Sequence, residues 1–188
     1  MIELLRIDDF LDAAACAALR DGLRQTAGAA ATVHGPAEGV QMQIRRTTRT
    51  AMPPAMRERV TQLLLARKDA LERHFDVTLE TCEEPQFLRY GPGDFFVAHQ
   101  DGNTPLIHDD TRFRKISAII FLSAASAEPL PDAYGGGVLT FHEPPFGSPV
   151  RLPLTAPPGT FVAFRAETTH EVTPVTHGER FTIVSWYR

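Results

Sequence analysis

The sequence has little cysteine and no long apolar run. Its 188 residues include only two cysteines, Cys16 and Cys82, and we expect both to be reduced and structural. No stretch approaches the roughly 20 apolar residues that a membrane-spanning helix needs. The N-terminal segment MIELLRIDDFLD lacks the basic head and apolar core of a signal peptide. These absences predict a cytoplasmic protein without a membrane segment.

An excess of charge of one sign is also missing. The chain has 19 Lys and Arg against 23 Asp and Glu, a net charge of −4, so it has no electrostatic basis for a nucleic-acid partner. The glycine run Gly135–Gly137 lacks the lysine and the following helix of a phosphate-binding loop, and it is expected to form a tight turn or a close backbone approach. The hydrophobic share of 43% is enough for a core, and the length predicts a single domain over residues 1–188.

The first 80 residues are predicted to form a helical N-terminal support. Asp8 and Asp9 predict a helix start before FLDAAACAALRDGL. Pro53 and Pro54 open a second predicted helix, which continues to about His74. Between them, the Gly- and Ala-rich segment 28–39 is predicted to form a loop. The basic segment RRTTRT at 45–50 predicts a solvated strand or loop rather than a substrate contact.

Short strand-like runs dominate the second half of the chain. They are rich in β-branched and aromatic residues and are separated by Gly and Pro. The predicted strands are Gln86–Tyr90, Lys115–Ser123, Gly137–His142, Val150–Leu154, Gly159–Phe164, Thr168–Val175 and Arg180–Tyr187. The fold class is therefore α+β and mainly β, with helices packed outside a β-sandwich or barrel.

A His-x-Asp pair follows the first of these strands. If His99 and Asp101 lie in a strand, their side chains point to the same side and can reach one metal ion. A third ligand is available from His170 in the segment ETTHEVTPV. Two imidazoles and one carboxylate that leave open positions are typical of non-haem Fe(II) oxygenases.

The last predicted strand carries a cation into an apolar interior. In RFTIVSWYR, alternation places Arg180, Thr182, Val184 and Trp186 on one face. A buried guanidinium needs a partner. A dicarboxylate co-substrate could supply one through a two-pronged salt bridge.

An ordered series of residues resembles the prolyl 4-hydroxylase-like branch of the 2-oxoglutarate- and Fe(II)-dependent oxygenases. The segment from Tyr90 to Asp101 resembles that family's Y-x-x-G-x-F-F-x-x-H-x-D motif. Further matching positions are Gly136, Gly137, Leu139, Phe141, Pro158, Gly159, Phe164, His170, Glu171, Val172, Pro174, Val175, Gly178, Arg180 and Trp186. The match covers about residues 85–188.

This resemblance implies a double-stranded β-helix, or jelly-roll, core over residues 85–188. It implies that Fe(II) is held by His99, Asp101 and His170, and that 2-oxoglutarate and O2 serve as co-substrates, with ascorbate as a reductant. Arg180 would bind the far carboxylate of 2-oxoglutarate. The remaining implied co-substrate contacts are Tyr90 as a hydrogen-bonding or lining neighbour, and Val172 and Trp186 as pocket walls.

The implied reaction is hydroxylation of a C–H bond, with a prolyl residue of a protein or peptide as the substrate. The alternatives are a free amino acid or small metabolite as substrate, or a cupin-like metal-binding sensor without turnover. Phe121 stands where some relatives carry a tyrosine that contacts the co-substrate, so that hydrogen bond is expected to be missing.

Two irregular stretches, 33–50 and 102–113, are expected to border the substrate cleft. Within the second stretch, His108 with Asp109 and Asp110 could form another metal cluster, although a solvated loop is the preferred interpretation.

Overall fold

The structure is a computed structural model that describes residues 2–32, 39–105, 107–143 and 149–188. The predicted loop residue His34 lies outside the described residues. Three α-helices and one 3-10 helix are present in the described part of the chain, with these bounds: α1 Ala13–Gln25, α2 Pro54–Leu65, α3 Lys68–Phe75 and η1 Asp110–Phe113. None of these helices is long and apolar enough to cross a membrane.

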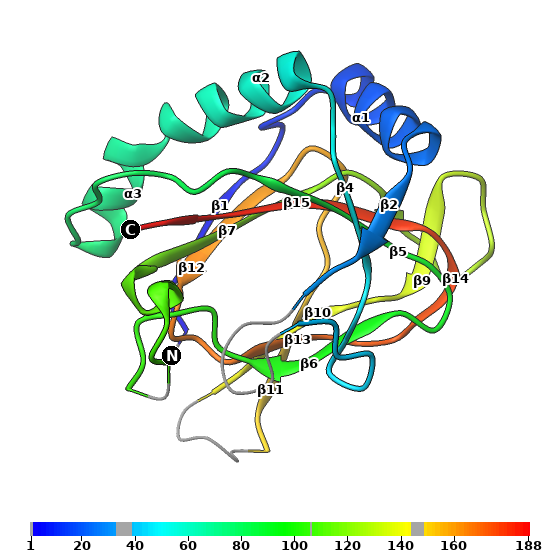
Figure 1. The fold of residues 1–188 in the computed structure, drawn as a ribbon. Helices are drawn as coiled ribbons and strands as arrows, with labels where there is room; N and C mark the ends of the chain where they lie inside the picture. Colours follow the sequence, from blue (N-terminus) through cyan, green and yellow to red (C-terminus); the bar gives the residue numbers. More distant parts are fainter. Residues whose placement is uncertain (1, 33–38, 106, 144–148) are drawn as a thin grey trace.

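Two sheets face each other and form a double-stranded β-helix (Figure 1). The larger has seven strands in the order β1 (Leu4–Ile7), β12 (Phe161–Arg165), β7 (Ile116–Phe121), β15 (Arg180–Tyr187), β5 (Gln86–Tyr90), β4 (Thr48–Thr50) and β2 (Gly28–Ala30). The smaller has five strands in the order β11 (Arg151–Leu154), β10 (Leu139–His142), β13 (His170–Val172), β6 (Phe95–His99) and β3 (Arg45–Arg46). A third sheet orders β14 (Val175–Gly178), β9 (Ala133–Gly136) and β8 (Ala124–Ala125).

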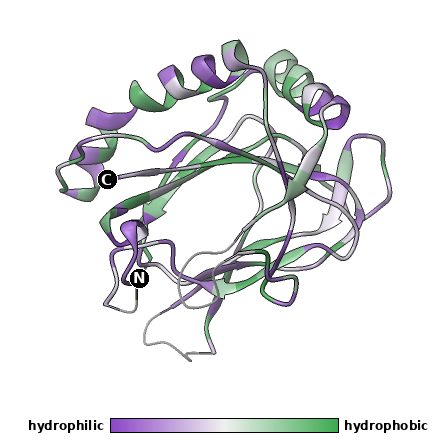
Figure 2. Ribbon diagram, in the orientation of Figure 1, coloured by the Kyte–Doolittle hydropathy of each residue, from purple (hydrophilic) through white to green (hydrophobic). Residues whose placement is uncertain are grey.

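The three helices cover the outer face of the seven-stranded sheet (Figure 1). Figure 2 shows that each helix carries both hydrophilic and hydrophobic residues, as expected for helices with one buried face. The buried helix residues Cys16, Leu64 and Phe75 join the same apolar cluster as Phe181 and Ile183 of β15. The fold class predicted from the sequence, mainly β with packing helices outside a jelly roll, is confirmed.

Both predicted helices differ from the structure in their bounds. The first begins at Ala13 rather than after Asp9, because the Asp12 carboxylate accepts a hydrogen bond from the Ala15 amide at 2.7 Å and caps the helix. Asp9 instead has a positive φ of 54° in the preceding turn. The second predicted helix is divided into α2 and α3 by a turn at Ala66 and Arg67. Neither residue is a glycine or proline, so the local sequence gave no signal for this break.

The N-terminal 80 residues also contribute strands. The predicted loop over 28–39 begins as β2, which pairs with β4. The segment 45–50 forms β3 and β4, and the expectation that it is solvated is wrong for Arg45. This side chain is buried because β3 pairs with β6, which places Arg45 opposite Phe96 on the inner side of the five-stranded sheet.

The two faces of β15 divide as the alternation predicts. Phe181, Ile183 and Tyr187 belong to the core beneath the helices. The opposite face, Arg180, Thr182, Val184 and Trp186, lines an internal cavity between the two large sheets. One strand therefore contributes both to the core and to the wall of the cavity.

Candidate metal centre and adjoining cavity

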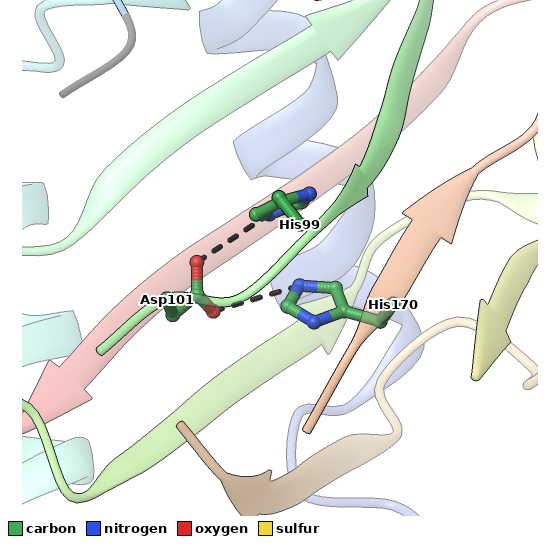
Figure 3. A group of neighbouring side chains, drawn as sticks. All are labelled: His99, Asp101 and His170. Carbon is green, nitrogen blue, oxygen red and sulfur yellow. Dashed lines mark ion pairs between the residues drawn. The ribbon is translucent and has the colours of Figure 1, made fainter. Parts of the chain in front are cut away.

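Three side chains from different elements meet on the inner side of the five-stranded sheet (Figure 3). His99 ends β6 and His170 begins β13, and the antiparallel register pairs these two residues directly. Asp101 lies beyond the end of β6, so the expected strand alternation does not extend to it. Its amide instead donates to the carbonyl of Ala166 at 2.9 Å, and this turn brings the carboxylate between the two imidazoles.

The three groups offer converging lone pairs. The Nε2 atoms of His99 and His170 each lie 3.5 Å from an oxygen of Asp101, and the three ligand atoms lie within 4.8 Å of one another. Each Nδ1 atom is hydrogen-bonded to a backbone carbonyl, at 2.8 Å from Val97 for His99 and at 2.9 Å from Thr168 for His170. An Nδ1–H that donates to a carbonyl leaves Nε2 as the free ligand atom.

The electrostatics of the cluster favour the ligand forms of Asp101 and His170. Burial opposes ionisation of Asp101, but the neighbouring imidazoles and the Ser117 hydroxyl outweigh it and hold its pKa well below its usual range. Burial, together with the neighbouring His99, lowers the pKa of His170 to about 4. At neutral pH the carboxylate is therefore ionised and the His170 imidazole is neutral, which are the forms that bind metal.

Ser117 is a part of this site that the sequence analysis missed. Its hydroxyl donates to Asp101 Oδ2 at 2.7 Å from β7, which lies in the opposite sheet. It is the one polar residue in the buried strand ISAIIF. A polar side chain in an apolar strand was the available signal, because alternation directs it to one face.

The residue after Asp101 must be small. A Cβ atom at Gly102 would lie 2.3 Å from the Thr111 carbonyl oxygen and 2.6 Å from Arg114 Cβ. Both contacts are far below van der Waals distance, and one is to backbone. Gly102 therefore allows the turn that carries Asp101 to pack directly against the segment before β7.

A cavity of about 300 Å³ adjoins the three side chains. Residues of both large sheets line it with a mainly apolar surface, and all seven residues singled out from the sequence are among its lining residues: Tyr90, His99, Asp101, His170, Val172, Arg180 and Trp186. The structure thus brings together every predicted site residue, although they span about half the chain.

Arg180 is almost completely buried at this cavity, with 2% of its surface exposed. Its Nη1 atom donates a long hydrogen bond of 3.5 Å to the Thr182 hydroxyl. Its Nε and Nη2 atoms have no hydrogen-bond partner in the described part of the chain. A buried guanidinium in this state favours an anionic ligand, because its desolvation is otherwise uncompensated.

Three aromatic rings surround the Arg180 guanidinium. The ring centroids of Tyr90, Phe121 and Tyr134 lie 5.2, 5.5 and 6.0 Å from its Cζ atom. Phe121 is fully buried and carries no hydroxyl, as the sequence indicated. Tyr134 was not singled out from the sequence, since nothing in its local pattern connects it with Arg180.

The glycine run 135–137 supports the position of Arg180, although Gly135 and Gly136 lie in β9 and do not form the predicted turn. Gly136 and Gly137 have positive φ values of 65° and 55°. A Cβ atom at Gly137 would lie 2.9 Å from both Arg180 Cδ and Val175 Cγ2. Glycine at this position therefore leaves the space through which the arginine side chain passes.

Trp186 and Arg114 form another part of the wall. The Arg114 guanidinium stacks on the Trp186 ring, with Cζ 3.7 Å from the ring centroid. It also donates two hydrogen bonds to the Glu83 carboxylate, at 2.9 and 2.7 Å. Unlike Arg180, this cation is fully paired within the protein.

The other histidines that the structure describes do not belong to the cluster. Asp109 caps η1 by accepting from Thr111, and no second metal-ligand group involving His108 or Asp110 is found among the described residues. His142 contacts Glu171, with Nε2 to Oε1 at 3.2 Å, and does not line the cavity. Described parts of the stretches 33–50 and 102–113 do line it, through Ile44, Arg45, Ile107, Asp109 and Thr111.

Comparison with known sequences agrees with this geometry. The model of the 2OG-Fe(II) oxygenase superfamily matches residues 85–188. A PKHD-type hydroxylase from Phenylobacterium zucineum is 33% identical over 144 residues, which cover 73% of this chain and 59% of the relative. Another from Burkholderia ambifaria is 36% identical over 127 residues, or 64% of this chain and 52% of the relative. The chain thus spans between about half and three fifths of these relatives' length.

Solved structures share the fold across the whole chain. A prolyl-4-hydroxylase from Pseudomonas putida has a TM-score of 0.71 at 22% identity and covers 100% of this chain and 93% of its own. A Trichoplax adhaerens prolyl hydroxylase, solved with a peptide fragment of hypoxia inducible factor, has a TM-score of 0.73 at 14% identity, with 100% and 84% covered. HygX from Streptomyces hygroscopicus, solved with nickel and 2-oxoglutarate, has a TM-score of 0.65 at 16% identity, with 99% and 82% covered. From the family match, the fold and the site together, we conclude that the chain belongs to the 2OG-Fe(II) oxygenase superfamily.

Proposed function

We propose that this protein is an Fe(II)- and 2-oxoglutarate-dependent dioxygenase that hydroxylates a C–H bond. One observation carries this proposal: a His–Asp–His cluster shares a cavity with a buried guanidinium that has two unpartnered nitrogen atoms. The cluster provides the ligands and the guanidinium provides a complementary charge for the dicarboxylate. Neither feature alone requires a co-substrate, but their presence in one cavity favours an enzyme over a metal-binding sensor.

The donor set fits Fe(II). His99, Asp101 and His170 would hold the metal through two imidazole nitrogens and one carboxylate oxygen, which leaves the side facing the cavity open. When bound, Fe(II) with 2-oxoglutarate and O2 supplies the oxidising chemistry, in which the keto acid becomes succinate and CO2 and one oxygen atom enters the substrate. The backbone carbonyls of Val97 and Thr168 keep the imidazoles in the required tautomer.

The remaining residues would bind and orient the co-substrate. Arg180 would pair with its far carboxylate through Nε and Nη2, the atoms that have no other partner. Tyr90 would contact the co-substrate from β5, where it lies opposite Arg180 in the strand register. Val172 and Trp186, each less than a tenth exposed, would exclude water from the apolar walls.

For the substrate we propose a prolyl residue of a protein or peptide. The fold match to two prolyl hydroxylases, one of them solved with a peptide, supports this choice. A free amino acid or small metabolite is the second candidate, since HygX has also been solved with hygromycin B bound. The described parts of the stretches 33–50 and 102–113 lie at the cavity and would contact the substrate in either case.

The decisive assay measures succinate formed from 2-oxoglutarate with Fe(II), ascorbate and O2. We expect His99→Ala, Asp101→Ala and His170→Ala to reduce turnover to background, and to reduce Fe(II) binding measured by equilibrium dialysis. His74→Ala, on the exposed side of α3, is the matched histidine control and should leave both unchanged. Full turnover without His170 would contradict the ligand assignment, and the absence of 2-oxoglutarate turnover in the iron-loaded protein would contradict the proposed function.

A further inference from the structure

Three guanidinium groups line the cavity, and they differ in how their charge is balanced. Arg114 is neutralised by two hydrogen bonds to Glu83. Arg180 has no carboxylate partner among the described residues, and the proposed co-substrate would supply one. Arg45 is the third, and the proposed function assigns it no role of its own. Two of these three cations thus lack a carboxylate partner among the residues that the structure describes, and a second anion could balance the second of them.

Arg45 is buried but incompletely bonded. Only 7% of its surface is exposed, and its Nη1 atom donates to the Thr32 carbonyl at 3.0 Å. Its Nε atom has no hydrogen-bond partner, and no carboxylate within the described ranges forms an ion pair with it. Its neighbour Arg46 is exposed and lies near Asp94, with Nε 3.7 Å from Oδ1. The buried member of this Arg-Arg pair is therefore the one without a counter-ion in the described part of the chain.

Ring contacts connect Arg45 with the metal ligands. Its Cζ atom lies 4.8 Å from the ring centroid of Phe96. The Phe96 ring in turn stacks on His99, with centroids 3.6 Å apart and planes 16° from parallel. Arg45 comes from the edge strand of the five-stranded sheet, whereas Arg180 comes from the seven-stranded sheet. A group bound at Arg45 therefore lies on the His99 side of the cavity, supported by a different sheet from the one that carries Arg180.

We propose that Arg45 forms a second carboxylate-binding subsite, which holds the substrate that is to be hydroxylated. This inference rests on the proposed function, in which Arg180 is occupied by 2-oxoglutarate. The unpaired Nε and the fork geometry of the guanidinium suit a carboxylate better than a neutral carbonyl. The carboxylate would belong either to a free amino acid or to an acidic side chain beside the reacting residue of a peptide.

The test measures binding and does not depend on turnover. Protein loaded with Zn(II) in place of iron and saturated with 2-oxoglutarate is titrated with matched carboxylate and amide probes. Trp186, the one tryptophan in the chain, lines the cavity and reports binding by its fluorescence. One arm uses the twenty L-amino acids against their α-amides. The other arm uses acetyl-Pro-Asp-amide against acetyl-Pro-Asn-amide, which distinguishes a side-chain carboxylate from a free amino acid.

We expect at least one carboxylate probe to bind wild-type protein about tenfold or more tightly than its amide, a difference typical of a charge-assisted hydrogen bond. Arg45→Met should reduce this preference to within twofold, and Arg45→Lys should keep part of it. Arg46→Met, the matched control from the exposed side of β3, should keep all of it. The affinity for 2-oxoglutarate, measured in the same samples, should remain unchanged in every variant.

Several results would overturn the subsite. The first is that wild-type protein shows no preference for the carboxylate probe in either arm, and the second is that the preference persists in Arg45→Met. The third is that Arg45→Met loses 2-oxoglutarate binding, which would place Arg45 at the co-substrate. If Arg45→Met does not fold by circular dichroism, Arg45→Gln takes its place. Succinate formation by iron-loaded wild type, measured in parallel, reports on the proposed function separately, so failure of one inference is not mistaken for failure of the other.

Discussion

The two faces of the seven-stranded sheet contact different surroundings. Its outer face packs apolar side chains such as Phe181 and Tyr187 against the helices. Its inner face presents Arg180, Ser117 and Thr182 to the cavity. Neighbouring residues on one strand thus belong to two environments. One is a close-packed apolar core, and the other is a cavity wall in which polar groups lack hydrogen-bond partners among the described residues. Strand alternation therefore places residues that stabilise the fold and residues that line the cavity at adjacent positions. Substitutions one residue apart should affect different properties, stability in one case and ligand binding in the other.

The sharpest test of this comparison uses the adjacent residues of β15. Phe181→Ala should lower the free energy of unfolding by about 3–5 kcal/mol, because it leaves a cavity beneath the helices. Arg180→Met should leave stability unchanged or raise it, since it removes a buried charge without a protein counter-ion. It should instead raise the KM for 2-oxoglutarate by about 30-fold or more. Denaturant unfolding and steady-state kinetics check both outcomes, and equal destabilisation by the two variants would refute the comparison.

The stability of the metal-free protein should depend on pH through His170, which lines the cavity from the five-stranded sheet. The pKa of His170 falls from 6.5 to about 4 on folding. As pH decreases from 6.5 to about 4, the His170 imidazole becomes protonated in the unfolded chain but stays neutral in the folded protein. The free energy of unfolding should therefore fall by up to about 3 kcal/mol. Above pH 6.5 this contribution disappears. The free energy of unfolding of wild type and of His170→Asn, measured from pH 7 to 4, separates the contribution of His170 from those of other groups. The same dependence on pH in both proteins would show that His170 is not its source.

A smaller effect is expected for the hydroxyl that orients Asp101. Ser117→Ala removes the 2.7 Å hydrogen bond and should weaken Fe(II) binding by about 10- to 100-fold. Ser185→Ala is the control from the outer face, where the hydroxyl donates to the Glu83 carbonyl. It should change stability without changing metal affinity. Dialysis against Fe(II) under anaerobic conditions measures both, and equal metal affinities in the two variants would remove Ser117 from the site.

The smallest predicted effect concerns Phe121. Phe121→Tyr would add a hydroxyl near the Arg180 guanidinium and should lower the KM for 2-oxoglutarate by about threefold to tenfold, the contribution of one hydrogen bond. Phe161→Tyr is the matched control, because Phe161 is equally buried but packs beneath the helices. Only the first variant should change KM. An unchanged KM in both would mean that the absent hydroxyl at 121 does not affect co-substrate binding.

Sequence reasoning was most successful where a pattern is local. Alternation in β15 was enough to separate Arg180 from Phe181. The His-x-Asp pair drew attention to His99 and Asp101, but Asp101 lies beyond the end of β6, so strand alternation does not explain its position. Sequence reasoning was less successful where contacts join distant segments. The break between α2 and α3 has no breaker residue, and Arg45 becomes buried only because β3 pairs with β6. Tyr134 reaches the site from a strand whose own sequence does not connect it with Arg180, and the local signal for Ser117 was its polarity in an apolar strand.

The glycine turn before β10 has an evolutionary consequence. Because a methyl group at residue 137 would lie 2.9 Å from the Arg180 side chain, the identities of these two positions are linked although 43 residues separate them (180 − 137). Descendants that keep the arginine are expected to keep glycine there. A shorter side chain at 180 would remove only one of the close contacts, because a methyl group at 137 would still lie 2.9 Å from Val175 Cγ2 and the positive φ of 55° would remain. Glycine at 137 should therefore persist in lineages that lose the arginine, whereas the arginine should not persist in lineages that lose the glycine.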